Sequence, residues 1–387
     1  MLRAPATGLG AALVLAPLVA LACAPEDAAA WGHRGVAASA AVESAPSDTE
    51  PTSVARSSVP RARTSEARAP EHLADTGLYA DFAAKLVRAD ALPYTPRYPL
   101  WSDGATKRRW IALPAGASID GANPDVWDFP VGTKVWKEFS FGRRVETRYL
   151  ERAADGAWIY ATYLWNADET DAVRAPDAGV RAARGAALRH DVPSRTDCLA
   201  CHEGSPVPVL GVNALQLASA RDPLAPHGEA PLPGAVDARA LVERGLLRLE
   251  RAYVEDGDVA ARTPRERAAL GYLHGNCGGC HNAQGPLASL GLELDLRVAD
   301  RARIPALRTA LDVESKLRRP EDAVHLRIAS GAPERSLLVE RMSSRFGALQ
   351  MPPLGTHVVD EDALALVTDW IREDLAGPRT AAETPRR

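Results

Sequence analysis

Two copies of the pattern Cys-x-x-Cys-His constrain this 387-residue chain more than any other feature. Each copy holds two cysteines and a histidine: Cys198, Cys201 and His202, then Cys277, Cys280 and His281. The pattern is typical of covalent haem attachment, in which two thiols bond to one porphyrin and the adjacent histidine ligates the iron. The sequence therefore predicts two covalently attached haem c groups, with His202 and His281 as iron ligands.

Other uses of paired cysteines fit the sequence less well. A zinc ribbon places its two pairs about 15–20 residues apart, whereas Cys277 follows Cys201 by 76 positions. A thioredoxin-like dithiol needs a βαβ context, which is missing here. Two local disulfides suit an oxidising compartment. None of these alternatives explains why a histidine follows the second cysteine in both motifs.

Methionine is scarce, which narrows the choice of a second iron ligand. The chain has three methionines: Met1, Met342 and Met351. Met351 follows His281 by 70 positions, which leaves room for the chain to wrap a porphyrin and return. The two prolines after Met351 stiffen its loop and keep it extended. We expect Met351 to ligate the iron held by His281; the alternative is a packing role in a proline-rich loop.

The second ligand of the first haem is left open by the sequence. Six residues are conceivable: His190, His227, His274, His325, His357 and Met342. Met342 lies in a helix-like run, which favours core packing for it. If none of the six binds, the first iron has an open axial position at which catalysis becomes possible.

The N-terminal residues are typical of an exported protein. Residues 1–22 combine Arg3, an apolar stretch and the small-x-small sequence at 20–22, and predict a signal peptide rather than a membrane span. Cys23 follows directly, where a bacterial lipoprotein carries its lipidated cysteine, although Ala20 stands where leucine is usual. We expect a lipid anchor at Cys23 and a location at the periplasm-facing membrane surface. The alternative is release into the periplasm with a free thiol.

Composition adds two expectations. Residues 23–70 contain few large apolar side chains and predict a disordered tether, because such a segment cannot bury enough surface to fold. The net charge is −4, with 46 basic against 50 acidic residues, so nucleic acid is not an expected partner.

Residues 71–190 predict a β-rich domain. Alternating and β-branched runs predict strands over 107–113, 133–141, 144–151 and 157–165, with an Asp-Gly hairpin turn before the last. A short helix is expected over 78–87, and an antiparallel sandwich is the predicted architecture. The loop Trp101-Ser102-Asp103-Gly104 and the basic run at 107–109 are interpreted as a turn and a solvated edge strand rather than a binding surface.

Two haem modules are expected next, at 191–262 and 263–376, before a disordered tail at 377–387. Asp237, Thr263 and Asp360 are each placed to cap a helix, and the helix begun by Thr263 would deliver Cys277 to a porphyrin. The predicted fold class is therefore α+β and multidomain. It combines an N-terminal antiparallel, sandwich-like β domain with two all-α cytochrome c-like haem modules.

Residues 71–376 resemble a little-characterised family of exported bacterial dihaem c-type cytochromes, many of them lipoproteins. The matching stretches are Pro99-Leu100-Trp101-Ser102-Asp103-Gly104-Ala105, Pro130-Val131-Gly132-Thr133, Glu146-Thr147-Arg148, Cys198-Leu199-Ala200-Cys201-His202, Leu210-Gly211, Gln216-Leu217, Tyr272-Leu273-His274-Gly275-Asn276-Cys277 and Met351-Pro352-Pro353-Leu354-Gly355. The resemblance implies an N-terminal β-rich domain, haem binding and electron transfer, with no defined substrate. Similarity to dihaem cytochrome c peroxidases is weaker, because their two motifs lie much further apart.

These observations predict an exported dihaem cytochrome that passes electrons between a redox protein donor, such as a periplasmic or membrane dehydrogenase, and an acceptor. An electron carrier is favoured over a self-contained enzyme. One alternative is a peroxidase-like dihaem oxidoreductase that uses an open first haem. Another is a β-domain binding module with cytochromes attached.

Overall fold

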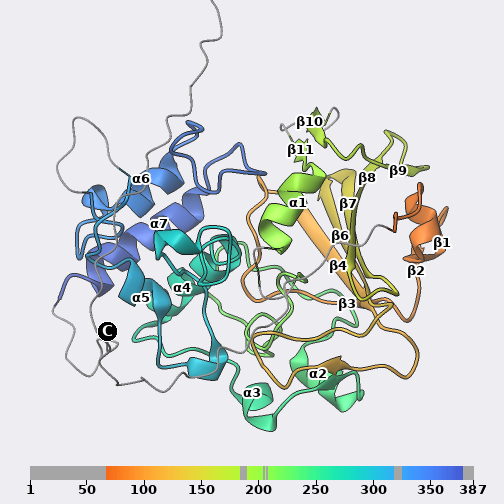
Figure 1. Cartoon of the computed structure of the whole chain (residues 1–387), viewed down its shortest axis with the longest axis horizontal. Coiled ribbons are helices and arrows are strands. Elements are labelled where there is room, and N and C mark those ends of the chain that lie inside the picture. Colours follow the sequence, from red (N-terminus) through yellow and green to blue (C-terminus); the bar gives the residue numbers. More distant parts are fainter. Residues whose placement is uncertain (1–66, 184–189, 204, 206–207, 318–324, 378–387) are drawn as a thin grey trace, which may run out of the picture. The chain divides into compact units, whose positions relative to one another are not determined.

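The computed structural model describes residues 67–183, 190–203, 205, 208–317 and 325–377, which all belong to one compact unit (Figure 1). The predicted signal peptide at 1–22, the lipidation site Cys23, most of the tether at 23–70 and most of the tail at 377–387 lie outside the described residues.

A six-stranded antiparallel sheet dominates the first half of the described chain. Its strands, in spatial order, are β3 (Leu92–Pro93), β4 (Thr106–Ala112), β6 (Lys134–Phe141), β7 (Arg143–Arg152), β8 (Trp158–Trp165) and β9 (Ala172–Arg174). The four longest match the predicted strands to within two residues, and the predicted hairpin turn is confirmed by Gly156, which has a φ of 76°. Alternation and turn chemistry therefore located this sheet correctly.

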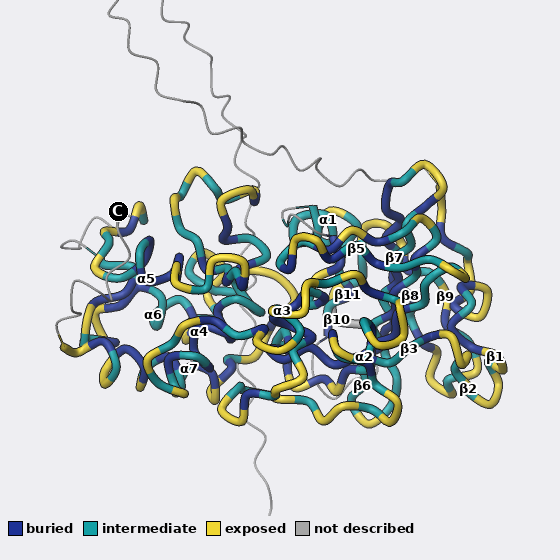
Figure 2. Tube along the Cα trace, turned by 90° about the horizontal axis from the view of Figure 1, so that it is seen from below, coloured by how far each residue is buried: buried dark blue, intermediate teal, exposed yellow. Residues whose placement is uncertain are grey.

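The two faces of the sheet serve different purposes. One face packs Trp110, Trp136, Tyr149 and Tyr163 into a core. That core is covered by a short hairpin of β1 (Tyr79–Asp81) and β2 (Leu86–Val87) and by a 3₁₀ turn at Leu73–Thr76. The other face belongs to the larger core shared with the second half of the chain. Buried stretches accordingly run along β7 and β8 (Figure 2).

Short helices and long irregular connections make up the second half. The α-helices are α1 (Arg195–His202), α2 (Ala238–Glu243), α3 (Arg251–Glu255), α4 (Pro264–Asn276), α5 (Pro305–Thr309), α6 (Leu337–Ser343) and α7 (Glu361–Asp369), which continues as a π-helical turn at Trp370–Asp374. The 3₁₀ turns are Ala288–Leu290, Val298–Asp300 and Pro333–Arg335. The predicted caps at Asp237, Thr263 and Asp360 are confirmed, because each side chain accepts a backbone hydrogen bond from the first turn of its helix.

Small strand pairs join distant parts of the chain. β10 (Val180–Ala183) pairs with β11 (His190–Val192), and β5 (Ile119–Asp120) pairs in parallel with β12 (Leu247–Arg248). The second pair couples the predicted β-rich domain to the segment predicted as the first haem module.

The predicted fold class is wrong. The β region is a single twisted sheet with small hairpins rather than a sandwich, and no all-α haem module is evident among the described residues, where only 24% of the structure is helical. Helix α4, with 13 residues, is the longest of the α-helices. The expected helix over 78–87 is likewise wrong, because those residues form the β1–β2 hairpin, with Lys85 at a φ of 54°. Helical spacing of apolar residues is sustained over α4 and α7 but not between them, so a haem motif alone did not imply a bundle.

Helix α4 is held by close backbone contacts. It packs on α7, where the Trp370 indole donates to buried Glu266 at 3.4 Å. On another side, Gly271 and Gly275 lie against Tyr98 so closely that a Cβ atom would meet the ring at 2.1 Å and the Tyr98 carbonyl oxygen at 2.6 Å, respectively. The absence of a side chain at these two positions therefore sets how near α4 approaches the segment before β4.

We expect Gly275→Ala to lower the free energy of unfolding by about 1–3 kcal/mol, because backbone must move to admit the new methyl group. Guanidinium titration of the purified protein measures this. The matched control is Gly279→Ala, since a Cβ at Gly279 meets nothing within 4 Å. Equal stability of the Gly275→Ala variant and the unchanged protein would contradict the close approach.

Candidate functional site

The first Cys-x-x-Cys-His motif forms most of α1. Ser194 and Asp197 begin this helix with a reciprocal capping box, in which each side chain accepts the other's backbone N–H at 3.0–3.1 Å. The helix contacts β8, and the ring of His202 lies 5.4 Å from the ring of Tyr160. The capped helix therefore presents Cys198, Cys201 and His202 beside the sheet.

His202 has the protonation and orientation that a metal ligand needs. Its Nδ1 donates to the carbonyl oxygen of Pro208 at 2.5 Å, which leaves the Nε2 lone pair available. Burial, helped by the positive charges of Arg148 and Lys137, lowers the pKa of His202 to about 4, although the hydrogen bond to Pro208 opposes the shift. The imidazole is thus neutral near pH 7, and its free nitrogen can ligate iron.

The second motif begins where α4 ends. Cys277 donates its backbone N–H to Leu273 at 2.8 Å, and His281 donates to Cys277 at 2.9 Å, so the motif continues as turns. His281 is buried, and its Nδ1 has no hydrogen-bond partner among the described residues. Burial, with the charges of Arg341 and Arg327, lowers the pKa of His281 to about 4. This imidazole is also neutral near pH 7.

The two motifs meet in space. The Cys201 and Cys280 thiols lie close enough to interact, and this interaction lowers the pKa of Cys201 to about 7 and raises that of Cys280. The sequence pattern assigned these cysteines to separate modules. The structure instead brings the second cysteine of each motif near the other.

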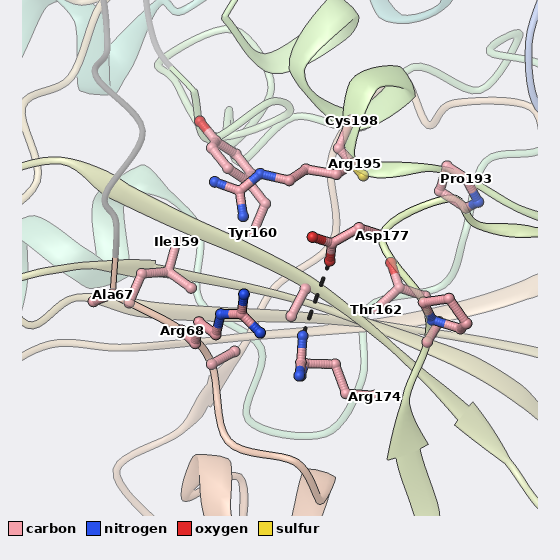
Figure 3. Close-up of a pocket in the computed structure, with 14 residues that line it drawn as sticks. Ala67, Arg68, Ile159, Tyr160, Thr162, Arg174, Asp177, Pro193, Arg195 and Cys198 are labelled. Atoms are coloured by element: carbon pink, nitrogen blue, oxygen red, sulfur yellow. Dashed lines mark ion pairs between the residues drawn. The ribbon is translucent and has the colours of Figure 1, made fainter.

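One cavity of about 960 Å³ contains every residue that the sequence predicted as a haem ligand or attachment point. Its wall includes Cys198, Cys201, His202, Cys277, Cys280, His281 and Met351. This volume lies at the upper end of the roughly 300–1,000 Å³ that ligand pockets occupy. Cys198 also borders a smaller cavity of about 250 Å³ with Tyr160 and Arg195, beside an ion pair of Arg174 with Asp177 (Figure 3).

Met351 is held at the cavity by its neighbours. Its backbone N–H donates to the carbonyl of Arg341 at 2.9 Å, at the end of α6, and Arg341 is also near enough to His281 to lower its pKa. The Gln350 amide donates to the carbonyl of Thr356 at 2.8 Å and closes the loop on itself. The Met351–Pro352 bond is cis. The loop is therefore ordered around Met351 rather than merely stiffened by its prolines.

The loop at 101–104 has a role that the sequence interpretation missed. The Asp103 carboxylate accepts the backbone N–H groups of His357 and Val358 at 2.9–3.0 Å, at the end of the methionine loop. Trp101 donates its backbone N–H to the side chain of Asn276, the residue before Cys277, at 2.7 Å. The predicted turn is confirmed at Asp103 and Gly104, where φ is 53° and 79°. The loop also ties the second motif to the methionine loop, which the sequence interpretation did not include, and the Asp-Gly pair was the signal in the sequence.

The interpretation of the basic run at 107–109 as a solvated edge strand was also wrong. β4 lies between β3 and β6, although β3 pairs only with Trp110 and Ile111, and the side chains of Lys107 and Arg109 are buried. Arg109 lines the large cavity and forms an ion pair with Glu229. Lys107 and Arg109 are therefore buried, with Arg109 at the site, whereas Arg108 points to the other face of the sheet, is partly exposed and pairs with Glu138.

The candidates for the first haem's second ligand can now be reduced. Three of the six line the large cavity: His190, His274 and Met342. The Nδ1 of His274 accepts the backbone N–H of Leu296 at 3.0 Å, so the ring proton is on Nε2. This histidine therefore has no lone pair left to ligate iron. His190 donates through Nε2 to Glu146 at 2.6 Å and keeps its Nδ1 lone pair. His190 and Met342 remain the two candidates at the cavity.

Among the described residues, no group of three or more His, Cys, Asp or Glu side chains is arranged to hold a bare metal ion. Haem needs no such group, because the porphyrin itself supplies four of the iron's ligands and the protein adds one or two axial ones. In the same part of the chain, every helix is too short or too polar to span a bilayer. Comparisons with protein-family models, curated proteins and solved structures found no match.

We expect Asp103→Asn to loosen the methionine loop, because an amide presents one acceptor where the carboxylate presents two. Hydrogen exchange at the amides of His357 and Val358 should accelerate by about tenfold, which corresponds to the loss of roughly 1–1.5 kcal/mol of hydrogen bonding. Asp155→Asn, in the β7–β8 turn, is the matched control and should leave these amides unchanged. Unchanged exchange in the Asp103 variant would contradict the tie between the two loops.

Proposed function

We propose that this protein is a dihaem c-type cytochrome that transfers electrons between redox partners. The observation that carries the proposal is the single cavity whose wall contains both cysteine pairs, both motif histidines and Met351. Seven residues of these types, drawn from three separate stretches of the chain, have no shared purpose in a packed core. Covalent haem attachment and iron ligation account for all seven together.

The residues fit the group at the level of individual atoms. Both motif histidines are neutral near pH 7, and His202 keeps Nε2 free by donating through Nδ1. The four cysteines are free thiols at partly buried positions, as thioether formation with a porphyrin requires. In this proposal Cys198, Cys201 and His202 hold one haem, while Cys277, Cys280, His281 and Met351 hold the other.

Haem, when bound, supplies one-electron chemistry at its iron. The chain's own residues then set the conditions for it. Burial around His281 keeps water from its imidazole, and the Asp103 and Gln350 contacts restrain the loop that carries Met351. The proximity of the Cys201 and Cys280 sulfurs puts one attachment point of each haem beside the other, which favours electron exchange between them.

A dihaem oxidoreductase is the second candidate, and one observation favours it. His274 accepts a hydrogen bond through Nδ1, and Glu146 engages the Nε2 of His190, so the Nδ1 of His190 and the sulfur of Met342 are the candidate ligands left at the cavity for the first iron. An open axial position there would admit a small substrate such as a peroxide. Spectra of the oxidised protein separate the two functions: six-coordinate low-spin iron at both haems supports the carrier, and a high-spin signal supports the enzyme.

Export, the lipid anchor at Cys23 and redox partners at the periplasmic face complete the proposal. Intact mass of the native protein tests the anchor, because cleavage before Cys23 with triacylation leaves a defined mass. The donor and acceptor of this cytochrome would be proteins that exchange single electrons, with the donor sought among periplasmic or membrane dehydrogenases.

Intact mass also tests the haem groups directly. We expect the mature protein to carry two covalent haem adducts after export in a host with a cytochrome c maturation system. Cys198→Ala with Cys201→Ala should carry one adduct, and Cys277→Ala with Cys280→Ala should carry the other. A protein matured under these conditions without any adduct would refute the proposed function.

Met351→Ala should lower the midpoint potential of one haem only, because loss of the thioether removes a ligand that favours ferrous iron. Potentiometric titration of the two haems measures this. Met342→Ala is the comparison variant, since Met342 also lines the cavity and is a candidate ligand of the other haem; its loss should leave unchanged the potential of the haem that Met351 ligates. An unchanged titration of the Met351 variant would exclude Met351 as a ligand, and a change only in the Met342 variant would reassign the role.

A further inference from the structure

A row of three basic residues crosses the cavity-facing side of the sheet. Arg109 on β4 lies directly opposite Lys137 on β6, and Lys137 lies directly opposite Arg148 on β7. All three line the large cavity. Like charges directly opposite each other destabilise a sheet, so this arrangement requires compensating negative charge.

The two outer members of the row have carboxylate partners. Arg109 forms an ion pair with Glu229, which also lies 3.5 Å from the Lys107 ammonium. Arg148 pairs with Glu146 at 2.5 Å. Among these six groups, four cations face two carboxylates, which leaves an excess of two positive charges.

Lys137, at the centre of the row, is the member without a carboxylate partner among the described residues. Its ammonium lies 4.8 Å from the ring of Phe139, and no carboxylate among the described residues is within ion-pair distance of it. Burial, reinforced by Arg109, Arg148 and Lys107, lowers its pKa well below the usual value. A cation held in this environment without a partner costs free energy, so the site is suited to an anion that enters the cavity.

The row lies beside the first motif. The His202 ring is next to Tyr160 on β8, and Tyr160 lies opposite Leu150, which is two residues along β7 from Arg148 and on the same face. The charges of Arg148 and Lys137 both help to lower the pKa of His202. The thiols of Cys198 and Cys201 help to raise the pKa of Arg148. An anion bound at Lys137 would therefore belong to whatever is attached at this motif.

We propose that Lys137, flanked by Arg109 and Arg148, binds a carboxylate in the cavity, namely a propionate of the haem attached at Cys198 and Cys201. Haem carries two propionates, and the row together with Lys107 has two more cations than carboxylates. This inference rests on the proposed haem function. A free dicarboxylate offers the same chemistry, so the test must separate the two sources.

Redox-difference infrared spectroscopy of the holoprotein, with ¹³C-labelled propionate carboxyls, tests the contact. Lys137→Met should shift a label-sensitive carboxylate band and lower the potential of one haem, because loss of a nearby cation disfavours the added electron. Lys137→Arg should restore both. Lys134→Met is the matched control, since Lys134 is on the same strand, points to the other face and donates to the Thr76 carbonyl.

Two outcomes would overturn this inference, and a third would refute the proposed function on which it rests. Label-sensitive bands that are identical in the Lys137→Met variant and the unchanged protein exclude a propionate contact. A saturable effect of added succinate on the unchanged holoprotein, lost in Lys137→Met while the labelled bands stay fixed, assigns the row to a free dicarboxylate and also overturns the inference. Lys137→Gln replaces the methionine variant if that one does not fold. Absence of haem adducts by intact mass refutes the proposed function itself, before the row is tested.

Discussion

The interaction between Cys201 and Cys280 is the constraint on which the rest of the site depends. It joins a helix end packed beside the sheet to a turn that follows α4, across 79 positions of sequence. Both motifs line one cavity, and residues of the sheet such as Lys137 and Arg148 form part of its wall. The two motifs therefore form one composite site, and neither is enclosed by residues of its own segment alone.

Features set by local sequence were predictable. The four long strands follow from alternation, and the starts of α2, α4 and α7 follow from Asp237, Thr263 and Asp360, because caps and period-2 patterns act over a few residues. The seven residues proposed to hold haem could be selected for the same reason: their spacing, or a flanking pair of prolines, is visible in the chain. The structure then brings all seven to one wall.

Features set by distant partners were not predictable. The Asp103 carboxylate accepts the backbone N–H groups of His357 and Val358, which follow it by 254 and 255 positions. Arg109 finds its carboxylate at Glu229, 120 positions later. Charge on a strand is normally a sign of exposure, so Lys107 and Arg109 looked like an edge, and only the tertiary fold buries their side chains and supplies Glu229 as their partner. The prediction of all-α haem modules was wrong for a similar reason, because a Cys-x-x-Cys-His motif specifies how a haem is attached and not the fold around it.

The two halves of the site use different means of support. Around His281 and Met351 the chain relies on loops held by backbone hydrogen bonds, with Asp103 and Gln350 as the acceptor and donor that restrain them. Around His202 it relies on the sheet, whose fixed register places Arg109, Lys137 and Arg148 in a line. A loop can adjust to a metal ligand, whereas a strand register holds charge at set positions. The part around His281 and Met351 is thus suited to tuning the ligation of a bound iron. The part around His202 is suited to fixing the electrostatic environment of the group that occupies the cavity beside it.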